Sequence, residues 1–347
     1  MIRLIIVSLV LLAVTIPLTY AQTSFSPYGS VRVGMWYENE DEDWSLTGES
    51  TLNLNYYLQG NSRFGAKFSD GDKQGRVEFG GTGSIRHLWG SYNMGTYTIL
   101  IGHTETLLTQ KGSMNFGSEN NFVGWGAVDN SRRPQVRFDL DNGVSLAFVQ
   151  PRLTNVAGID QAKTVLLPKL NLGYKGKIGD NMSLNGALGV NMYNYDDNDG
   201  HHDETVMSYV LGMLLDMDLD PMTVTLHGNF GQNTGNYGLG SQTHNIAIWN
   251  GADEEIVDVT TLGGFGELAY KMNNEMKLTL GASYTMSDCD LFDNADTAMA
   301  AFGQISYRPV SGFSITPEVG LLDKMKDKED HAQGSLLYFG TQLRMDF

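Results

Sequence analysis

Most of the chain beyond residue 25 alternates between apolar and polar side chains. Between Leu52 and Phe68 the even positions are mostly apolar, whereas the odd positions are mostly polar or basic. The same period of two recurs in residues 182–192, 222–230, 276–285 and 313–321. This period predicts β-strands, because successive side chains of a strand point to opposite faces of a sheet. No long segment has the spacing of an amphipathic helix, so the sequence predicts an all-β fold.

The composition of the polar face separates two kinds of β protein. One apolar and one polar face per strand would also fit a soluble β-sandwich. Here the polar face is rich in Gly, Ser, Thr and Asn, which suits a water-filled lumen, and the Leu, Val, Met and Phe face suits lipid. Many predicted strands also exceed ten residues, whereas sandwich strands usually have about five or six. We therefore expect a transmembrane antiparallel β-barrel.

Short and long connections alternate along the chain. Short connections with turn residues lie at 70–72, 93–95, 141–143, 179–181, 218–221, 273–274 and 310–312. Mostly longer, acidic stretches lie at 38–51, 80–84, 104–132, 152–164, 195–204, 233–255, 289–296 and 323–332. Short periplasmic turns and long extracellular loops are typical of an outer-membrane barrel. Seven turns and eight loops predict about sixteen strands, with both ends of the chain on the turn side.

The composition narrows the class of protein further. The length of 347 residues alone would also allow two domains. A mean hydropathy of −0.22 excludes a helical membrane bundle. The net charge of −17 argues against a nucleic-acid partner, because phosphate binding needs clustered Lys and Arg. The single cysteine, Cys289, fits an exported protein without an intrachain disulfide.

The first 21 residues predict a cleaved signal peptide. A basic start at Arg3 is followed by an apolar run over 4–18 and by Ala21 at the expected cleavage site. The apolar run is shorter than the ~20 residues that a membrane-spanning helix needs, which argues against a retained anchor. We therefore expect residues 1–21 to be removed during export and residues 22–347 to form the barrel.

The last predicted strand carries the clearest family feature. It alternates along its whole length and ends on Leu343, Met345 and Phe347. With this strand, the sequence resembles a Gram-negative outer-membrane porin of the 16-stranded, trimeric kind. Residues 61–67 (NSRFGAK) are similar to the second strand of that family. Residues 86–103 are similar to the strand–turn–strand that precedes its constriction loop.

The resemblance implies a function and a set of partners. The protein would form a water-filled channel in the cell outer membrane for passive diffusion of small hydrophilic solutes and ions. It would be a homotrimer surrounded by lipid and lipopolysaccharide. The barrel-assembly machinery would read the final strand, with Phe347, Met345 and Leu343 as the assembly signal.

The predicted inward face carries several basic residues in the first half of the barrel. They are Arg32, Arg63, Lys67, Arg76, Arg86 and Arg137. The resemblance implies that the longest loop, 104–132, folds into the lumen and presents Glu105, Glu119 and Asp129 to them. His103 stands just before this loop, where general porins often have Arg. Opposed charges would create a transverse field that orients dipolar solutes. The alternative is pairing along the wall with inward acids, namely Glu78, Asp139, Glu267 and Glu318.

Two other functions fit the same barrel. A solute-selective channel would bind sugars or organic anions, and its inward aromatic residues would stack on the ligand; the candidates are Trp36, Tyr57, Tyr193 and Tyr338. An adhesin or scaffold would use its loops while the lumen is plugged.

Catalysis, a cofactor and a specific metal site are not expected. The chain contains no Gly-x-Ser-x-Gly elbow, Walker loop or dinucleotide fingerprint. Cys289 lies between Asp288 and Asp290, which should raise its thiol pKa and disfavour a nucleophile. The acidic loop 196–204 lacks the EF-hand spacing. Loose divalent bridging to lipopolysaccharide suits such loops better than a specific metal site.

Overall fold

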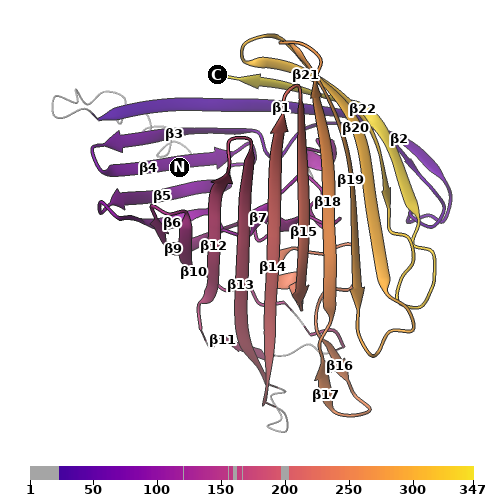
Figure 1. The fold of residues 1–347 in the computed structure, drawn as a ribbon. Coiled ribbons are helices and arrows are strands. Elements are labelled where there is room, and N and C mark those ends of the chain that lie inside the picture. The colour runs from indigo at the N-terminus through magenta and orange to yellow at the C-terminus, as the bar shows by residue number, and fades with distance from the viewer. Residues whose placement is uncertain (1–22, 120, 155, 159–161, 166, 197–202) are drawn as a thin grey trace, which may run out of the picture.

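The computed structural model describes residues 23–119, 121–154, 156–158, 162–165, 167–196 and 203–347. The expected signal peptide, 1–21, lies outside these residues. The described chain forms one sheet of 18 strand segments, and pairing of the first segment with the last closes it into a barrel (Figure 1). The fold is therefore the predicted antiparallel β-barrel.

The barrel wall contains the long strands that the alternating pattern predicts. Its segments are β1 (Ser24–Glu40), β2 (Thr51–Leu58), β3 (Arg63–Asp70), β4 (Lys73–Gly80), β5 (Ile85–Asn93), β6 (Tyr97–Glu105), β9 (Arg132–Leu140), β10 (Val144–Val149), β11 (Ala162–Val165), β12 (Lys169–Ile178), β13 (Met182–Asp196), β14 (Asp203–Leu219), β15 (Met222–Gln232), β18 (Thr260–Lys271), β19 (Met276–Asp288), β20 (Asp296–Val310), β21 (Phe313–Asp323) and β22 (Ser335–Asp346).

Two pairs of these segments are interrupted single strands. β2 and β3 both pair with β1. The pairing with β2 ends at Val33↔Leu58, and the pairing with β3 begins at Ser30↔Arg63. β11 and β12 likewise pair with successive parts of β13. The 18 segments therefore make sixteen strands, which confirms the number predicted from the turns and loops.

The two faces of the wall differ as the alternation predicts. Outward side chains are apolar and exposed, for example Leu54 (58% exposed), Phe64 (54%) and Phe339 (48%). Inward side chains such as Asn171 and Ser208 are polar and covered. An apolar outer band around a polar interior matches a barrel that sits in a lipid bilayer. In the described part of the chain, no helix is long and apolar enough to cross a membrane.

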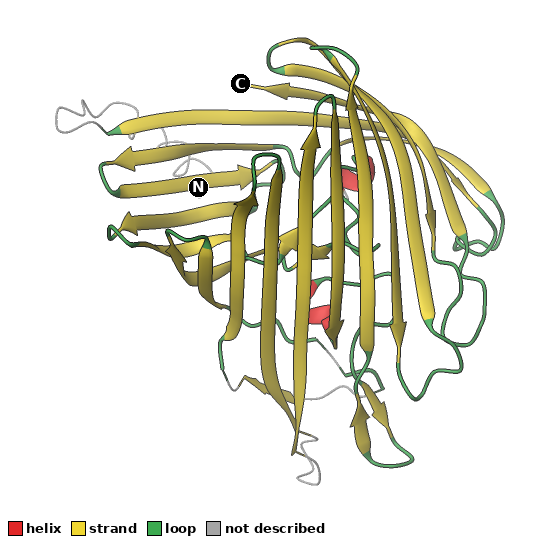
Figure 2. Ribbon diagram, viewed as in Figure 1, coloured by secondary structure: helices red, strands yellow, loops and turns green. Residues whose placement is uncertain are grey.

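The loops at one rim carry the remaining elements. We name the loops that the site uses L1 (41–50), L3 (106–131), L4 (150–161), L6 (233–259) and L8 (324–334). L3 contains β7 (Thr109–Gln110), α2 (Phe116–Glu119) and β8 (Val128–Asp129), and L6 contains η1 (Thr234–Tyr237), β16 (Ile248–Asn250) and β17 (Glu255–Val257). Figure 2 shows the two short helices in red among the strands that surround the lumen.

Candidate functional site: the barrel lumen

L3 lies inside the barrel along one side of its wall. Near its start, the Gln110 side chain donates to the carbonyl oxygen of Asn185 on β13 (2.7 Å). At its tip, the backbone N–H of Asn115 donates to Glu318 of β21, and its carbonyl accepts from Gln59. Gln59 lies between β2 and β3. L3 therefore follows the inner wall from β13 round to the start of β3.

Two inward carboxylates hold the tip of L3. Glu318 Oε2 accepts from the backbone N–H of Asn115 (2.8 Å), and its Oε1 accepts from the backbone N–H of Phe116 (3.1 Å) and from the Tyr338 hydroxyl (2.9 Å). Glu267 Oε1 accepts from the backbone N–H of Ser113 (2.6 Å), and its Oε2 accepts from the Ser113 hydroxyl (2.9 Å). The sequence suggested that these two acids pair with wall cations. Their hydrogen bonds make them anchors of L3 instead.

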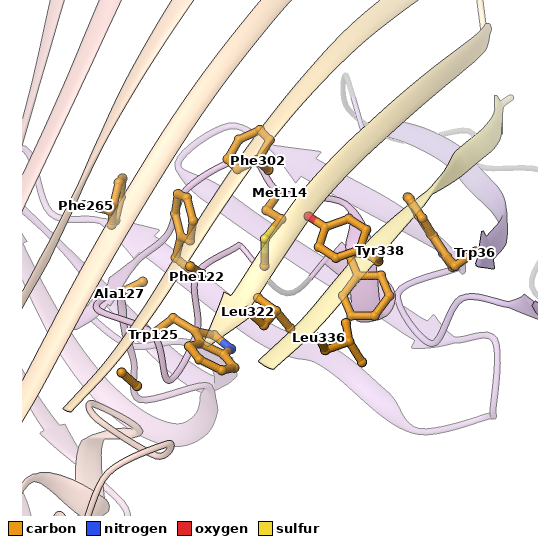
Figure 3. Close-up of a cluster of buried hydrophobic side chains, with 13 residues drawn as sticks. Trp36, Met114, Phe122, Trp125, Ala127, Phe265, Phe302, Leu322, Leu336 and Tyr338 are labelled. Atoms are coloured by element: carbon orange, nitrogen blue, oxygen red, sulfur yellow. The ribbon is translucent and has the colours of Figure 1, made fainter. Parts of the chain in front are cut away.

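An apolar cluster adds to this attachment (Figure 3). Phe116 stacks on Tyr338, with ring centroids 4.1 Å apart, and packs edge-on against Trp36. Phe122 packs on Phe265 and Phe302 of the wall. The apolar side chains of L3 thus cover inward aromatic residues that would otherwise face water, which stabilises the docked loop.

The same packing removes most of the aromatic residues proposed to stack on a solute. Trp36 and Tyr338 are fully buried beneath L3, and Tyr57 packs against the same cluster. Tyr193 is buried with residues of L4 and L6, including Val156. These four side chains therefore do not form an accessible ligand track.

A cluster of cations lies on the part of the wall that L3 does not follow. Glu78 of β4 is fully buried and accepts from Arg76 Nη2 (2.6 Å), Arg86 Nε (2.7 Å) and the Tyr28 hydroxyl (2.7 Å). Arg63 Nε lies 4.0 Å from the same carboxylate. We call Arg63, Arg76 and Arg86 the basic arc. Three cations around one carboxylate leave the arc with a net charge of +2.

A β-bulge explains how Arg86 reaches this cluster. The register between β4 and β5 shifts between Glu78 and Phe79. A bulge places one extra residue on a strand and redirects its side chains. Arg86 and the adjacent His87 therefore both contact the lumen side, where His87 Nδ1 lies 2.9 Å from the Thr104 hydroxyl. His87 keeps the regular inward phase of β5 that it shares with Trp89, whereas Arg86 is the extra residue that the bulge brings to the same side.

The other predicted basic residues, Arg32, Lys67 and Arg137, each have a different environment. Arg32 is buried and its Nε donates to Ser30 (3.1 Å). The Lys67 ammonium lies 5.9 Å from the centroid of the Tyr28 ring. Arg137 pairs with Asp139 of its own strand (2.9 Å). Wall pairing therefore describes Arg137 and the basic arc, whereas Arg32 is positioned by a hydroxyl.

The predicted loop acids are mostly paired close to their own position. Glu105 pairs with Arg132 (2.9 Å), and Asp129 pairs with Lys111 within L3 (2.9 Å). Glu119 ends α2, and its side chain lies outside the described part of the structure. Among the described residues, neither Glu105 nor Asp129 contacts the basic arc.

His103 does not line the lumen. It pairs in register with Leu88, whose side chain is exposed on the outer face. Cross-strand partners point to the same side of a sheet, so His103 faces outward. It shares its phase with Ile99 and Ile101, and this alternation is readable in the sequence.

The predicted assembly signal lies on the outer face at the turn rim. Phe347 exchanges backbone hydrogen bonds with Gly29 of β1 (2.7 and 3.1 Å). Its ring covers Gly29, where a Cβ would collide with it. Met345 and Phe347 are exposed, at 55% and 72%. Leu343 pairs in register with Val33, one of the outward residues of β1.

Two cavities lie on either side of L3. A polar cavity on the turn side has a volume of about 580 Å³ and lies between the start of L3 and the wall; its lining includes Arg76, His87, Trp89, Leu107, Arg137 and Lys175. A second cavity of about 600 Å³ opens among L1, L3 and L8 beside Trp44, Trp125 and Lys324. The turn-side cavity therefore lies against the part of the wall that carries Arg76 and Arg137.

At the loop rim, L1 is held to the end of L8. Asp41 accepts hydrogen bonds from the backbone N–H and hydroxyl of Ser335 (2.7 and 2.8 Å) and from the backbone N–H of Trp44 (2.9 Å). Partial burial acts to raise the pKa of Asp41, but these hydrogen bonds lower it on balance. Residues 197–202 of the acidic loop lie outside the described structure. In the remainder, no group of three potential ligands could hold a metal ion.

Comparisons with known proteins agree with this geometry. A family model described as the porin subfamily matches residues 53–341. No curated protein matches the sequence. Among solved structures, OmpT of Vibrio cholerae, folded in vitro, has a TM-score of 0.61 at 14% identity over 95% of this chain and 99% of its own. Salmonella typhi OmpF in complex with daunomycin has a TM-score of 0.60 at 12% identity, over 93% and 97% of the two chains.

A third structure extends the comparison, the anion-selective porin from Comamonas acidovorans. Its TM-score is 0.57 at 11% identity, over 94% of this chain and all of its own. Identities this low establish a shared barrel fold, while the family match spans most of the wall. The chain therefore belongs to the porin subfamily and forms an outer-membrane channel for small solutes.

Proposed function

We propose that the protein passes small hydrophilic solutes and ions by diffusion through the space between L3 and the basic arc. The observation that carries this proposal is the docking of L3 against one wall, with a polar cavity of about 580 Å³ on the other side. A large barrel with an inward-folded loop keeps an aqueous path while limiting solute size. The process requires no chemical step and no cofactor, so the protein is a channel rather than an enzyme.

The channel prefers anions over cations. Most lumen acids are occupied: Asp139 pairs with Arg137, Glu105 with Arg132, and Glu318 binds L3. The basic arc retains a net +2 charge, and fixed charges that line a pore set its ion selectivity. The overall charge of −17 is carried largely elsewhere, much of it in the acidic loops.

The biological unit is a homotrimer. One solved relative, OmpT of Vibrio cholerae, is described in a trimer form. In this chain β4, β5, β6, β9 and β10 have only six to nine residues, whereas β14 has 17. A tilted strand needs about 9–11 residues to cross a bilayer. Packing the outer faces of the short strands, especially β4 and β5, against a neighbouring copy would cover this low wall.

The outer surface and the last strand supply the remaining partners. The apolar outer band contacts outer-membrane lipid, and the acidic loops contact lipopolysaccharide through divalent cations. The barrel-assembly machinery recognises the final strand with its terminal Phe347. The exposed ring of Phe347 lies over Gly29 of β1, where the first and last strands of the barrel pair.

Planar-bilayer conductance tests the proposal. The purified protein should give discrete current steps, and in a tenfold KCl gradient the reversal potential should indicate anion preference. Liposomes containing the protein should swell in small sugars but not in large oligosaccharides. A barrel that inserts into the bilayer and gives neither current nor swelling would instead be a plugged adhesin or scaffold. Saturable current block by a sugar would favour a solute-selective channel.

A further inference from the structure

Three cations lie together at the loop-side ends of β9, β10 and β12. Gln135, Val149 and Lys169 form one row across these strands. On β9, Arg133 precedes Gln135 and points to the same, inward face of the wall. Arg152 lies in L4, just after the end of β10. Arg152 interacts electrostatically with both Arg133 and Lys169. This group is separate from the basic arc, which lies on β3, β4 and β5.

No carboxylate of the described chain compensates this cluster. Arg133 and Arg152 both act on Lys169 as like charges, and Arg152 acts on Arg133 in the same way. Lys169 is fully buried, and its ammonium donates to Asn130 Oδ1 (3.0 Å) and to the carbonyl oxygen of Asn236 (2.8 Å). It also lies 4.0 Å from the centroid of the Tyr237 ring. These groups solvate the ammonium but do not neutralise it.

Two unused hydrogen-bond donors belong to Arg133 and to Asn130, the residue that binds Lys169. Asn130 is 2% exposed, and its Nδ2 atom has no partner although its Oδ1 binds Lys169. The Nε atom of Arg133 is also buried without a partner. Buried donors and buried charge are both unfavourable unless an acceptor satisfies them.

A small oxyanion would satisfy both needs at once. It carries the missing negative charge, and its oxygens accept from several donors in one place. Arg133 and Arg152 supply guanidinium groups, which bind carboxylate and phosphate oxygens in pairs. Lys169 adds a positive point charge, and Asn130 adds a neutral donor. We propose that Arg133, Arg152, Lys169 and Asn130 form a binding site for the phosphate or carboxylate group of a solute entering the channel.

This site deepens the proposed function, because it rests on an anion-accepting lumen. An anion held at the loop-side entrance would be concentrated before it reaches the basic arc. Occupancy would then slow chloride, which shares the path, and the effect would saturate when the site is full.

The test uses inorganic phosphate as the probe. Chloride current through the purified protein in a planar bilayer is measured at fixed ionic strength with increasing phosphate. We expect a saturable decrease in wild-type current. R152Q and R133Q should each raise the half-blocking phosphate concentration roughly tenfold or more, because each removes a charged donor. The control is K175Q, which removes one lumen charge from the turn-side cavity; its half-blocking concentration should stay within about twofold of wild type.

The outcomes separate this site from the channel function. A conducting wild type with no saturable block, or an equal shift in K175Q and R152Q, would overturn the site and leave the channel intact. If wild type does not conduct, isothermal titration calorimetry of the detergent-solubilised protein with phosphate tests the site directly. Binding that R152Q and R133Q weaken but K175Q does not would support the site, and no binding heat would reject it.

Discussion

Replacing Glu318 by Gln should release the tip of L3 while leaving the barrel closed. Each oxygen of Glu318 accepts two donors: Asn115 contributes both donors to Oε2, while Phe116 and Tyr338 share Oε1. An amide has one acceptor oxygen, and its NH₂ group would face donors on the other side. The E318Q variant therefore loses two hydrogen bonds to a charged acceptor, whichever way the amide is oriented.

The size of the effect follows from those two bonds. A hydrogen bond to a charged group contributes about 1.5–3 kcal/mol, so the loss is about 3–6 kcal/mol. Since about 1.4 kcal/mol corresponds to a factor of ten, the undocked population of the tip should rise by about 10²–10⁴. The aromatic contacts of Phe116 with Tyr338 and Trp36 remain and keep most of L3 attached.

Hydrogen exchange measured by mass spectrometry detects this change at the affected amides. A peptide containing Asn115 and Phe116 should exchange at least about 100-fold faster in E318Q, because local opening controls its protection. A peptide over η1 in L6 provides the internal reference. D216N is the matched control, because Asp216 is an inward wall carboxylate that binds Thr225 rather than L3. Unchanged protection of the L3 tip in E318Q would refute the anchoring role of Glu318.

Three further predictions concern charge, reactivity and closure. R76Q should move the reversal potential toward cation preference by lowering the net charge of the basic arc from +2 to +1, whereas K73Q at the turn rim should leave it unchanged; equal shifts would contradict the arc's role. Burial raises the pKa of the Cys289 thiol, with its acidic neighbours acting in the same direction. Its alkylation by iodoacetamide should therefore be slow at pH 7 and accelerate as pH rises, with a midpoint above that of a free thiol. F347A should reduce the heat-modifiable folded band on gels, because the ring that covers Gly29 is lost; an unchanged band would argue against a role in closure.

The β-barrel could be predicted from the sequence because it depends on the local alternation of apolar and polar residues. The exposed Leu54 and Phe64 and the covered Thr279 and Thr285 follow the alternation predicted for residues 52–68 and 276–285. Turn residues at positions such as 141–143 separate the strands where the structure has turns. Each of these signals acts over a few residues, so their combination also gave the correct number of strands.

The sequence does not predict the path of L3 along the inner wall in the same way. Glu267 and Glu318 have the inward phase of any wall acid, and only the fold brings Ser113 and Asn115 to them. Likewise, Trp36 has the phase of a lumen residue whether a loop or water covers it. The bulge beside Glu78 breaks the alternation at Arg86, so sequence phase alone does not bring Arg86 and the adjacent His87 to the same side of the wall.

The docking of L3 also explains how an acidic protein can maintain a basic passage. L3 uses two inward carboxylates, Glu267 and Glu318, as hydrogen-bond acceptors for its own backbone, which removes them from the passage. The apolar face of the loop then covers the aromatic part of the wall. The surface left to solutes is the side that carries the basic arc, where three cations share Glu78. The charge that a solute meets is therefore set by which wall the loop covers, and releasing the loop should change selectivity as well as conductance.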